Sequence, residues 1–195
     1  MALAVAAAEA VEQVAGFAPR LKWPNDLVWP GDGSDADRKL AGILAEADWP
    51  AGSPASGGYR QPDPTERVVV VAGIGLNVTW PDALPDELAD IAVACNHVTG
   101  AEVDREDLLI ALLRRLDAHY ADLVSGGDRA ALTAAWRARS ATLGRRVRID
   151  PGSDDVEGTA VDVTEDGHLV VETPDGSRRT FAVGDVIHLR SGLRP

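Results

Sequence analysis

Residues 39–44 (KLAGIL) set a lysine and a glycine inside a short apolar run, and this stretch decides how we expect the chain to fold. Two segments of similar character flank it, residues 22–27 (KWPNDL) and residues 73–78 (GIGLNV). Each joins polar or charged groups to a strand-like apolar run. Burying a lysine ammonium or a carboxylate costs several kcal/mol unless a partner neutralises it. The three segments therefore predict a polar ligand pocket built on neighbouring strands.

The chain around these segments is expected to form one helix followed by strands. Residues 2–15 are alanine-rich, which favours a buried helix, and Gly16 stands where a C-terminal cap belongs. Strands are expected over residues 19–23, 27–29, 39–46 and 67–78, with 27–29 paired with 39–46. The expected connections are a turn at 24–26, a loop at 31–33 and a surface loop at 49–65. Four consecutive valines open the last strand, which predicts a central strand buried on both faces.

Two helices are expected next. Residues 104–124 carry apolar side chains at helical spacing, and Asp104 can cap the start. The side chains expected on its apolar face are Leu108, Leu109, Leu112, Leu113, Leu116, Tyr120 and Leu123. Gly126 and Gly127 end this helix, and a second one is expected over residues 128–139.

After Leu143 the apolar residues alternate with polar ones, as in half-buried strands. The alternating runs lie within 147–149, 159–163, 169–171, 181–183 and 187–189, with Asp-Gly turns at 166–167 and 175–176. These short strands predict a small SH3-like barrel. The fold class is therefore expected to be α+β, with a mixed sheet packed with helices in residues 1–142 and the barrel in residues 143–195.

The composition narrows the possible functions. The net charge of −12 argues against nonspecific affinity for nucleic acid or anionic membrane, although Arg145, Arg146 and Arg148 form a local basic patch. Cys95 is the only cysteine, so an intrachain disulfide is excluded, and we expect a small apolar role for it in or near a helix. Glu9 and Glu12 interrupt the first apolar run, which speaks against a signal peptide and makes a cytoplasmic location the expectation.

Lys39 admits two interpretations. A lysine at the head of an apolar strand commonly extends its ammonium to the surface. Alternatively, it holds a carboxylate and then a phosphoryl oxygen, because a fixed cation stabilises the charge that develops when two anions react. Gly42 would let a ligand or another backbone approach closely.

The two flanking segments also allow more than one reading. Asn25 and Asp26 suit a simple turn, but Asp26 could also orient a metal or accept a proton, and Mg²⁺ with ATP commonly takes one or two carboxylates. Gly73 and Gly75 do not form a dinucleotide-binding turn, because Val78 replaces the third glycine, so they more plausibly clear space for a flat ligand. The four histidines, His97, His119, His168 and His188, lack metal-ligand spacing and are expected to be structural.

Taken together, the segments at 22–27, 39–44 and 73–78 closely resemble, in order and content, the three hallmark segments of the catalytic domain of biotin protein ligases. The closing barrel, with residues 184–185 and 189–190 near its end, also resembles the C-terminal domain of that family. The resemblance implies a class II synthetase-like catalytic domain and an ATP-dependent ligase. Such an enzyme forms biotinyl-adenylate from biotin and ATP, with Mg²⁺, and transfers biotin to a lysine of a biotin carboxyl carrier protein domain.

The resemblance also implies roles for individual residues. Lys39 and Asp26 would be catalytic, with Asp26 a possible Mg²⁺ ligand. The residues implied in substrate binding are Lys22, Trp23, Asn25, Gly42, Ile43, Gly73, Gly75, Asn77 and Arg190. Two alternatives stay open, a lipoate-type ligase of related fold and a noncatalytic binding module. The family's upstream Gly/Arg-rich biotin-binding loop has no counterpart in residues 1–21, and some members' DNA-binding module has no room either. We therefore expect weak or no ligase activity from this chain alone, through truncation or a start codon assigned too late.

Overall fold

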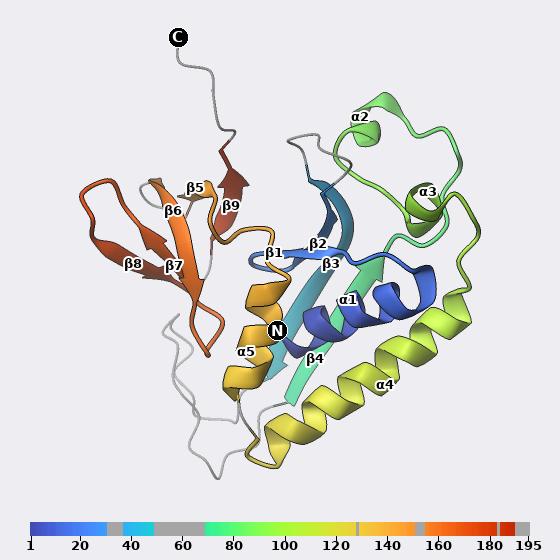
Figure 1. Ribbon diagram of the computed structural model, residues 1–195, viewed down its shortest axis with the longest axis horizontal. Coiled ribbons are helices and arrows are strands. Elements are labelled where there is room, and N and C mark those ends of the chain that lie inside the picture. The colour runs from blue at the N-terminus through green and yellow to red at the C-terminus, as the bar shows by residue number, and fades with distance from the viewer. Residues whose placement is uncertain (31–36, 49–68, 128, 151–154, 183, 190–195) are drawn as a thin grey trace.

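Helices cover one face of a four-stranded sheet, and a five-stranded sheet forms a small barrel beside it (Figure 1). The computed structural model describes residues 1–30, 37–48, 69–127, 129–150, 155–182 and 184–189. Within these residues the expected α+β class and the SH3-like barrel are both confirmed. The division into domains at 1–142 and 143–195 stays a prediction.

The first sheet has the order β1 (Arg20–Lys22), β2 (Asp26–Trp29), β3 (Arg38–Asp48) and β4 (Val69–Leu76). Every neighbouring pair of these strands is antiparallel. The expected mixed sheet is therefore wrong in this detail: the described parallel pairings are isolated bridges, Leu21 with Ser140 and Lys39 with Ala92, because each strand pairs with the next one along the chain and runs in the opposite direction. The expected pairing of residues 27–29 with residues 39–46 is confirmed. The loops expected at 31–33 and 49–65 lie outside the described residues.

Two helices pack together over one face of this sheet. Helix α1 (Ala2–Ala15) buries small alanine and valine side chains, which lets it lie close to α4 (Arg105–Val124). Asp104 caps α4 by accepting hydrogen bonds from the backbone N–H groups of Glu106 and Asp107, as its position predicted. Two short helices, α2 (Asp86–Ala89) and α3 (Cys95–Thr99), connect β4 to α4, and α5 (Arg129–Ala138) leads toward the barrel.

Two expectations about burial are wrong. Strand β4 pairs with β3 alone among the described strands, and Val69, Val70 and Val71 are 62%, 58% and 66% exposed. The valine run does not mark a strand buried on both faces, because strand propensity says nothing about which elements cover it. On α4 the expected apolar face is only partly buried: Leu108 and Leu112 are in the core, whereas Leu109, Leu113 and Tyr120 are exposed.

The second sheet has the order β8 (Arg178–Phe181), β7 (Leu169–Glu172), β6 (Val156–Val163), β5 (Arg146–Asp150) and β9 (Asp185–His188). Its buried side chains alternate along the strands, as predicted, and include Val147, Ile149, Leu169 and Val171. Gly167 and Gly176 have φ angles of 84° and 82° in the two hairpin turns. An L-residue with a side chain rarely adopts this conformation, which explains the Asp-Gly pairs.

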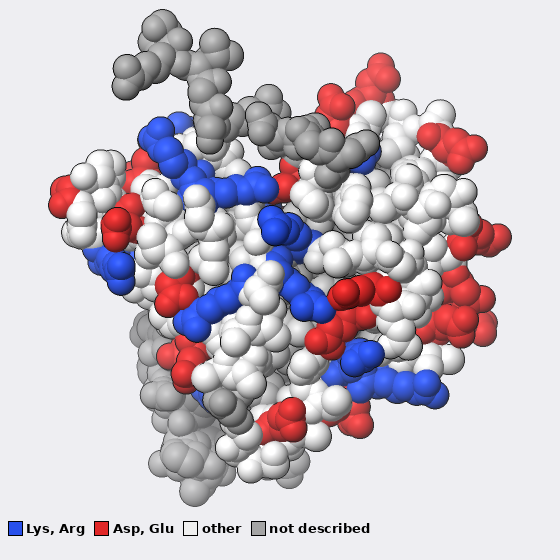
Figure 2. Space-filling model, viewed as in Figure 1, with Lys and Arg blue, Asp and Glu red and all other residues white. Residues whose placement is uncertain are grey.

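The charged side chains are unevenly spread. On the face that carries the helices, acidic side chains gather around α2 and the start of α4, and many of the basic ones lie over the barrel and α5 (Figure 2). The basic patch expected from Arg145, Arg146 and Arg148 is compensated, because each of the three pairs with a carboxylate. Among the described residues, none of the helices is long and apolar enough to cross a membrane.

Candidate active site

One row of residues runs across all strands of the first sheet. Lys22 of β1 lies opposite Asp26 of β2, Asp26 opposite Gly42 of β3, and Gly42 opposite Gly75 of β4. Residues directly opposite one another in antiparallel strands project from the same face. Their neighbours along the strands, such as Leu21, are buried on the helix-covered face. The three predicted segments therefore meet on the opposite face of the sheet.

An ion pair stands at the centre of this row. Lys39 Nζ lies 2.7 Å from Asp26 Oδ1, with the lysine side chain 51% exposed and the aspartate side chain 20% exposed. Asp26 Oδ1 is itself buried, and it has no hydrogen-bond partner among the described residues, so the contact with Lys39 is one of charge. Lys39 and Lys22 are the only lysines in the sequence, and both belong to this site.

Gly42 makes room for the ion pair. A Cβ atom at this position would lie 3.1 Å from both Cε and Nζ of Lys39 and 3.6 Å from Asp26 Oδ1. Beside it, a Cβ at Gly75 would meet nothing within 4 Å, and one at Gly73 only the Leu44 carbonyl at 4.0 Å. The glycines thus leave a flat backbone floor with open space above it, next to a cation and a carboxylate.

Two asparagines brace the backbone around Lys39. The Asn25 amide donates to the Ile43 carbonyl at 2.8 Å, and Ile43 N–H donates to the Asn25 carbonyl at 2.9 Å. The Asn77 amide donates to the carbonyls of Lys39 at 3.3 Å and Val93 at 3.2 Å. Cys95, buried beneath Asn77 at the start of α3 as expected, donates its N–H to the Asn77 carbonyl, and burial raises the pKa of its thiol to about 11.

The side chains of two predicted site residues, Trp23 and Ile43, do not lie on this face, and a third predicted residue is not described. Trp23 is buried; its backbone N–H donates to Thr142 Oγ1 and its indole N–H to the Gly167 carbonyl, so its side chain faces the barrel. The Ile43 side chain packs against the hydrophobic core. Arg190 lies outside the described residues.

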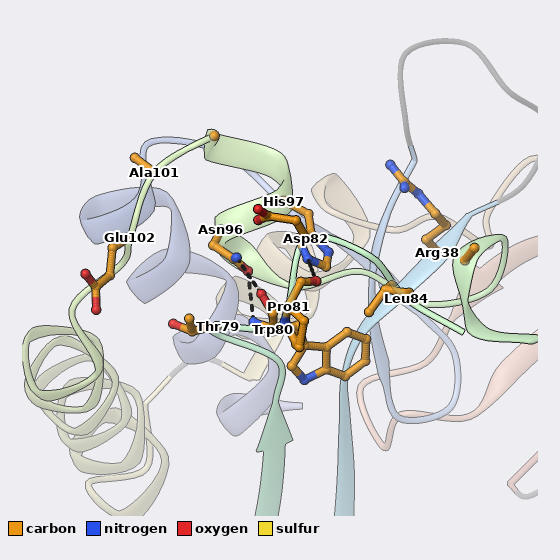
Figure 3. Close-up of a pocket in the computed structure, with 12 residues that line it drawn as sticks. Arg38, Thr79, Trp80, Pro81, Asp82, Leu84, Asn96, His97, Ala101 and Glu102 are labelled. Carbon is orange, nitrogen blue, oxygen red and sulfur yellow. Dashed lines mark hydrogen bonds between the residues drawn. The ribbon is translucent and has the colours of Figure 1, made fainter. Parts of the chain in front are cut away.

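A pocket of about 880 Å³ lies beside the site, and the sequence analysis did not anticipate it. Its lining includes Arg38, the residue before Lys39, and Trp80, three residues after Asn77 (Figure 3). Asn96 fixes the backbone of Trp80 by accepting from its N–H at 3.1 Å and donating to its carbonyl at 2.9 Å. His97 approaches the Pro81 carbonyl at 2.9 Å. The signal that could have revealed this pocket is the Trp80-Pro81 pair, which follows the third segment after Thr79.

Metal-binding side chains do not cluster here. The described residues contain no group of three or more histidine, cysteine, aspartate or glutamate side chains that could hold a metal ion. His119 pairs with Glu9, and His188 pairs with Asp37, so neither of these expected structural histidines is spaced as a metal ligand. Asp26 supplies a carboxylate beside Lys39, and Asp82 and Glu102 line the neighbouring pocket.

Comparison with known proteins places these features in context. The family described as "Biotin protein ligase C terminal domain" matches residues 142–189. The chain is 36% identical over 171 residues to a biotin--[acetyl-CoA-carboxylase] ligase of Mycobacterium tuberculosis, covering 87% of this chain and 53% of that protein. It is 27% identical over 180 residues to the bifunctional ligase/repressor BirA of Bacillus subtilis, covering 92% of this chain and 49% of that protein. The chain thus spans about half the length of these curated relatives.

Solved structures resemble the fold as well. The biotin protein ligase of Aquifex aeolicus in complex with biotin and ATP superimposes with a TM-score of 0.73 at 23% identity. The match covers 97% of this chain and 70% of that chain. At this level of identity the likeness concerns the fold alone.

Proposed function

We propose that this chain, which belongs to the biotin protein ligase family, contributes the adenylating centre of a ligase that attaches biotin to a lysine of a biotin carboxyl carrier protein domain. The observation that carries the proposal is the Lys39–Asp26 ion pair beside the floor formed by Gly42 and Gly75. A cation next to open, flat backbone suits a planar ligand that ends in a carboxylate.

In the first step an oxygen of the biotin carboxylate attacks the α-phosphorus of ATP. The bond from that phosphorus to the oxygen bridging to the β-phosphate breaks, and pyrophosphate leaves with the electron pair. Both reactants are anionic, so a positioned ammonium at Lys39 lowers the barrier by stabilising charge in the transition state. Asp26 keeps Lys39 in place, because its Oδ1 lies 2.7 Å from the ammonium.

In the second step the neutral amine of the carrier lysine attacks the acyl carbon of biotinyl-adenylate. The bond from that carbon to the phosphate oxygen breaks, AMP leaves, and the new amide nitrogen gives up a proton. We assign Lys22, Asn25 and Asn77 to the walls that orient the adenylate. Trp23 and Ile43 would act through their backbone, since their side chains are packed away from this face.

The pocket at Trp80 would take the nucleotide end of the adenylate. The aromatic ring of Trp80 offers a surface on which a base can stack. Arg38, on the pocket wall, is the residue next to Lys39. Arg190 would approach the nucleotide from the end of the barrel.

Magnesium fits this site only through the substrate. Mg²⁺ bound to ATP keeps several waters and takes one or two protein carboxylates, and Asp26 can supply one of them. When bound, the ion would neutralise phosphate charge, while Lys39 and the backbone floor act on the carboxylate that reacts.

The test is Lys39→Ala assayed by biotin-dependent exchange of pyrophosphate into ATP. Losing a cation that pairs with transition-state charge costs about 3–4 kcal/mol, so the exchange rate should fall by roughly two to three decades. Arg148→Ala, which removes a barrel cation paired with Glu157, is the control and should leave the rate unchanged.

The same assay separates the alternatives. Exchange that depends on lipoate rather than biotin would identify a lipoate-type ligase. A chain that binds ATP or biotin without exchange, and does not modify a carrier domain, would be a binding module. Retention of most of the exchange by Lys39→Ala would remove Lys39 from the mechanism.

A further inference from the structure

A buried polar cluster joins the first sheet to the barrel. The Asp37 side chain, just before β3, is only 7% exposed. Arg145 binds it with both terminal nitrogens, Nη1 to Oδ2 at 2.8 Å and Nη2 to Oδ1 at 3.2 Å. His188 of β9 reaches the same carboxylate, with Nδ1 3.1 Å from Oδ2. The other ring nitrogen, Nε2, lies 3.2 Å from Thr142 Oγ1.

The donors and acceptors of this cluster close into a continuous relay. Trp23 N–H donates to Thr142 Oγ1 at 3.0 Å, which leaves the threonine hydroxyl free to donate to His188 Nε2. In the tautomer that accepts at Nε2, the proton is at Nδ1 and that N–H donates to Asp37, while Arg145 Nη1, 3.3 Å from Nδ1, donates to Asp37 Oδ2 instead. The imidazole bridges the two ends because it offers an acceptor and a donor on opposite sides of one rigid ring.

The ends of the relay reach the candidate site from both sides. Asp37 precedes Lys39 by two residues and sits where the chain enters β3. Trp23 follows Lys22, so its backbone N–H fixes the end of β1, where Lys22 lies opposite Asp26 of β2. His188 lies at the end of β9, two residues before Arg190. One set of hydrogen bonds therefore holds both members of the ion pair and the last barrel strand.

We propose that Asp37, His188 and Thr142 are positioning residues, which set the Lys39–Asp26 ion pair in register with the barrel. The geometric part of this inference stands on the described contacts. Its effect on catalysis rests on the proposed function.

The energetics favour a fixed arrangement over a loose one. Burial alone would raise the pKa of Asp37, but the hydrogen bond from His188 and the charge of Arg145 outweigh it and hold the pKa below 3.8. The carboxylate is therefore charged and depends on its partners, because a buried charge that loses its partner is strongly destabilising. Movement of the barrel away from β3 would break several of these bonds at once.

The test uses the fact that the sequence contains two lysines, Lys22 and Lys39. Labelling with [13Cε]lysine therefore gives two NMR resonances, and a variant that lacks one of the lysines assigns both. Thr142→Val keeps the shape of a fully buried side chain but leaves Trp23 N–H and His188 Nε2 without a partner. We expect the Lys39 resonance to shift, and the biotin-dependent exchange rate to fall by tenfold or more. Thr142→Ser restores the hydroxyl and should restore both readouts.

Thr133→Val is the matched control. Thr133 is also buried, in α5, and its hydroxyl bonds the Arg129 carbonyl within its own helix, away from the relay. This variant should lose stability without moving the Lys39 resonance. Should Thr142→Val fail to fold, His188→Gln and His188→Asn replace it, since each keeps one side of the imidazole and neither bridges both.

The possible results of these experiments distinguish the positioning role from a merely structural one, and both from a failure of the proposed function. A Lys39 resonance that stays in place in every relay variant, with stability losses like that of Thr133→Val, would overturn the positioning role and leave a merely structural cluster. A shifted resonance supports the geometric part whatever the exchange assay gives. If Lys39→Ala also retains exchange, the proposed function fails while the relay stands.

Discussion

Replacing Gly42 by alanine should disturb the candidate site without unfolding the protein. The new Cβ would lie 3.1 Å from Cε and Nζ of Lys39, closer than ordinary contact at 3.4–4 Å. The clash is with the far end of a flexible side chain, so the lysine moves and the backbone does not. Alanine is favoured over glycine inside a strand by about 0.5–1 kcal/mol, which offsets a weakened and partly exposed ion pair worth at most about 1 kcal/mol.

The size of the effect on Lys39 follows from the distances. Relief of the clash requires a shift of about 0.3–0.9 Å away from the alanine. If the distance from Nζ to Asp26 Oδ1 grows from 2.7 Å by that amount, the Coulomb term before solvent screening falls by roughly 0.6–1.5 kcal/mol at an effective dielectric constant of about 20, which is an upper bound because the exposed pair is worth at most about 1 kcal/mol in total. The same displacement relative to a bound carboxylate corresponds to a roughly 3- to 12-fold loss in exchange rate. Because the Lys39 side chain is half exposed, solvent screens its charge, and we expect a loss in exchange rate near the lower end of this range.

The assay combines urea unfolding with the [13Cε]lysine spectrum and pyrophosphate exchange. Gly42→Ala should shift the Lys39 resonance even without ligand, with an unfolding free energy within about 1 kcal/mol of the parent. Gly75→Ala is the informative contrast: its Cβ meets nothing within 4 Å, so the free protein should be unchanged and only ligand binding should suffer. An unmoved Lys39 resonance in Gly42→Ala, or identical behaviour of the two variants, would refute the reasoning.

Three further results are expected. Asp37 has a depressed pKa, so its contribution to stability is present above about pH 4 and is lost as the pH falls. The unfolding free energy of Asp37→Asn should therefore decrease less than that of the parent between about pH 4 and pH 2. Urea midpoints of the two proteins that fall in parallel across that range would contradict this. The buried Cys95 thiol, with its pKa raised to about 11, should resist iodoacetamide at pH 8 in the folded protein and react readily in urea, whereas rapid labelling of the native chain would show that it is accessible. Arg190→Ala should weaken ATP binding more than biotin binding in calorimetric titrations, and an equal or larger loss for biotin would argue against its placement near the nucleotide.

Local signals predicted much of this fold. The Asp104 cap, the Asp-Gly hairpin turns and the alternation in the barrel each depend on residues a few positions apart, and the structure contains all of them. The meeting of the segments at 22–27, 39–44 and 73–78 also followed from their strand character. The β-ladder register then added what sequence could not, the direct opposition of Asp26, Gly42 and Gly75.

Local patterns did not reveal the contacts between residues distant in the sequence. The indole N–H of Trp23 donates to Gly167, 144 positions away, and no local pattern reveals such a partner. The expected role of Trp23 in substrate binding stays a prediction. Asp37 and His188 lie 151 positions apart, and neither stood out as one of a pair. The valines of β4 show the same limitation, because their exposure depends on which elements neighbour the strand.

The confinement of both lysines to one face has a consequence for self-modification. An activated acyl group that escapes from an adenylating enzyme acylates nearby amines, and the enzyme's own surface is the first protein it meets. Of the 19 lysines and arginines in the sequence, the other 17 are arginines. Their guanidinium groups stay protonated at neutral pH and are poor acyl acceptors. Side-chain autoacylation would therefore fall on Lys22 or Lys39, so a mass increase on a tryptic peptide containing either residue would report an acyl-adenylate formed at this face.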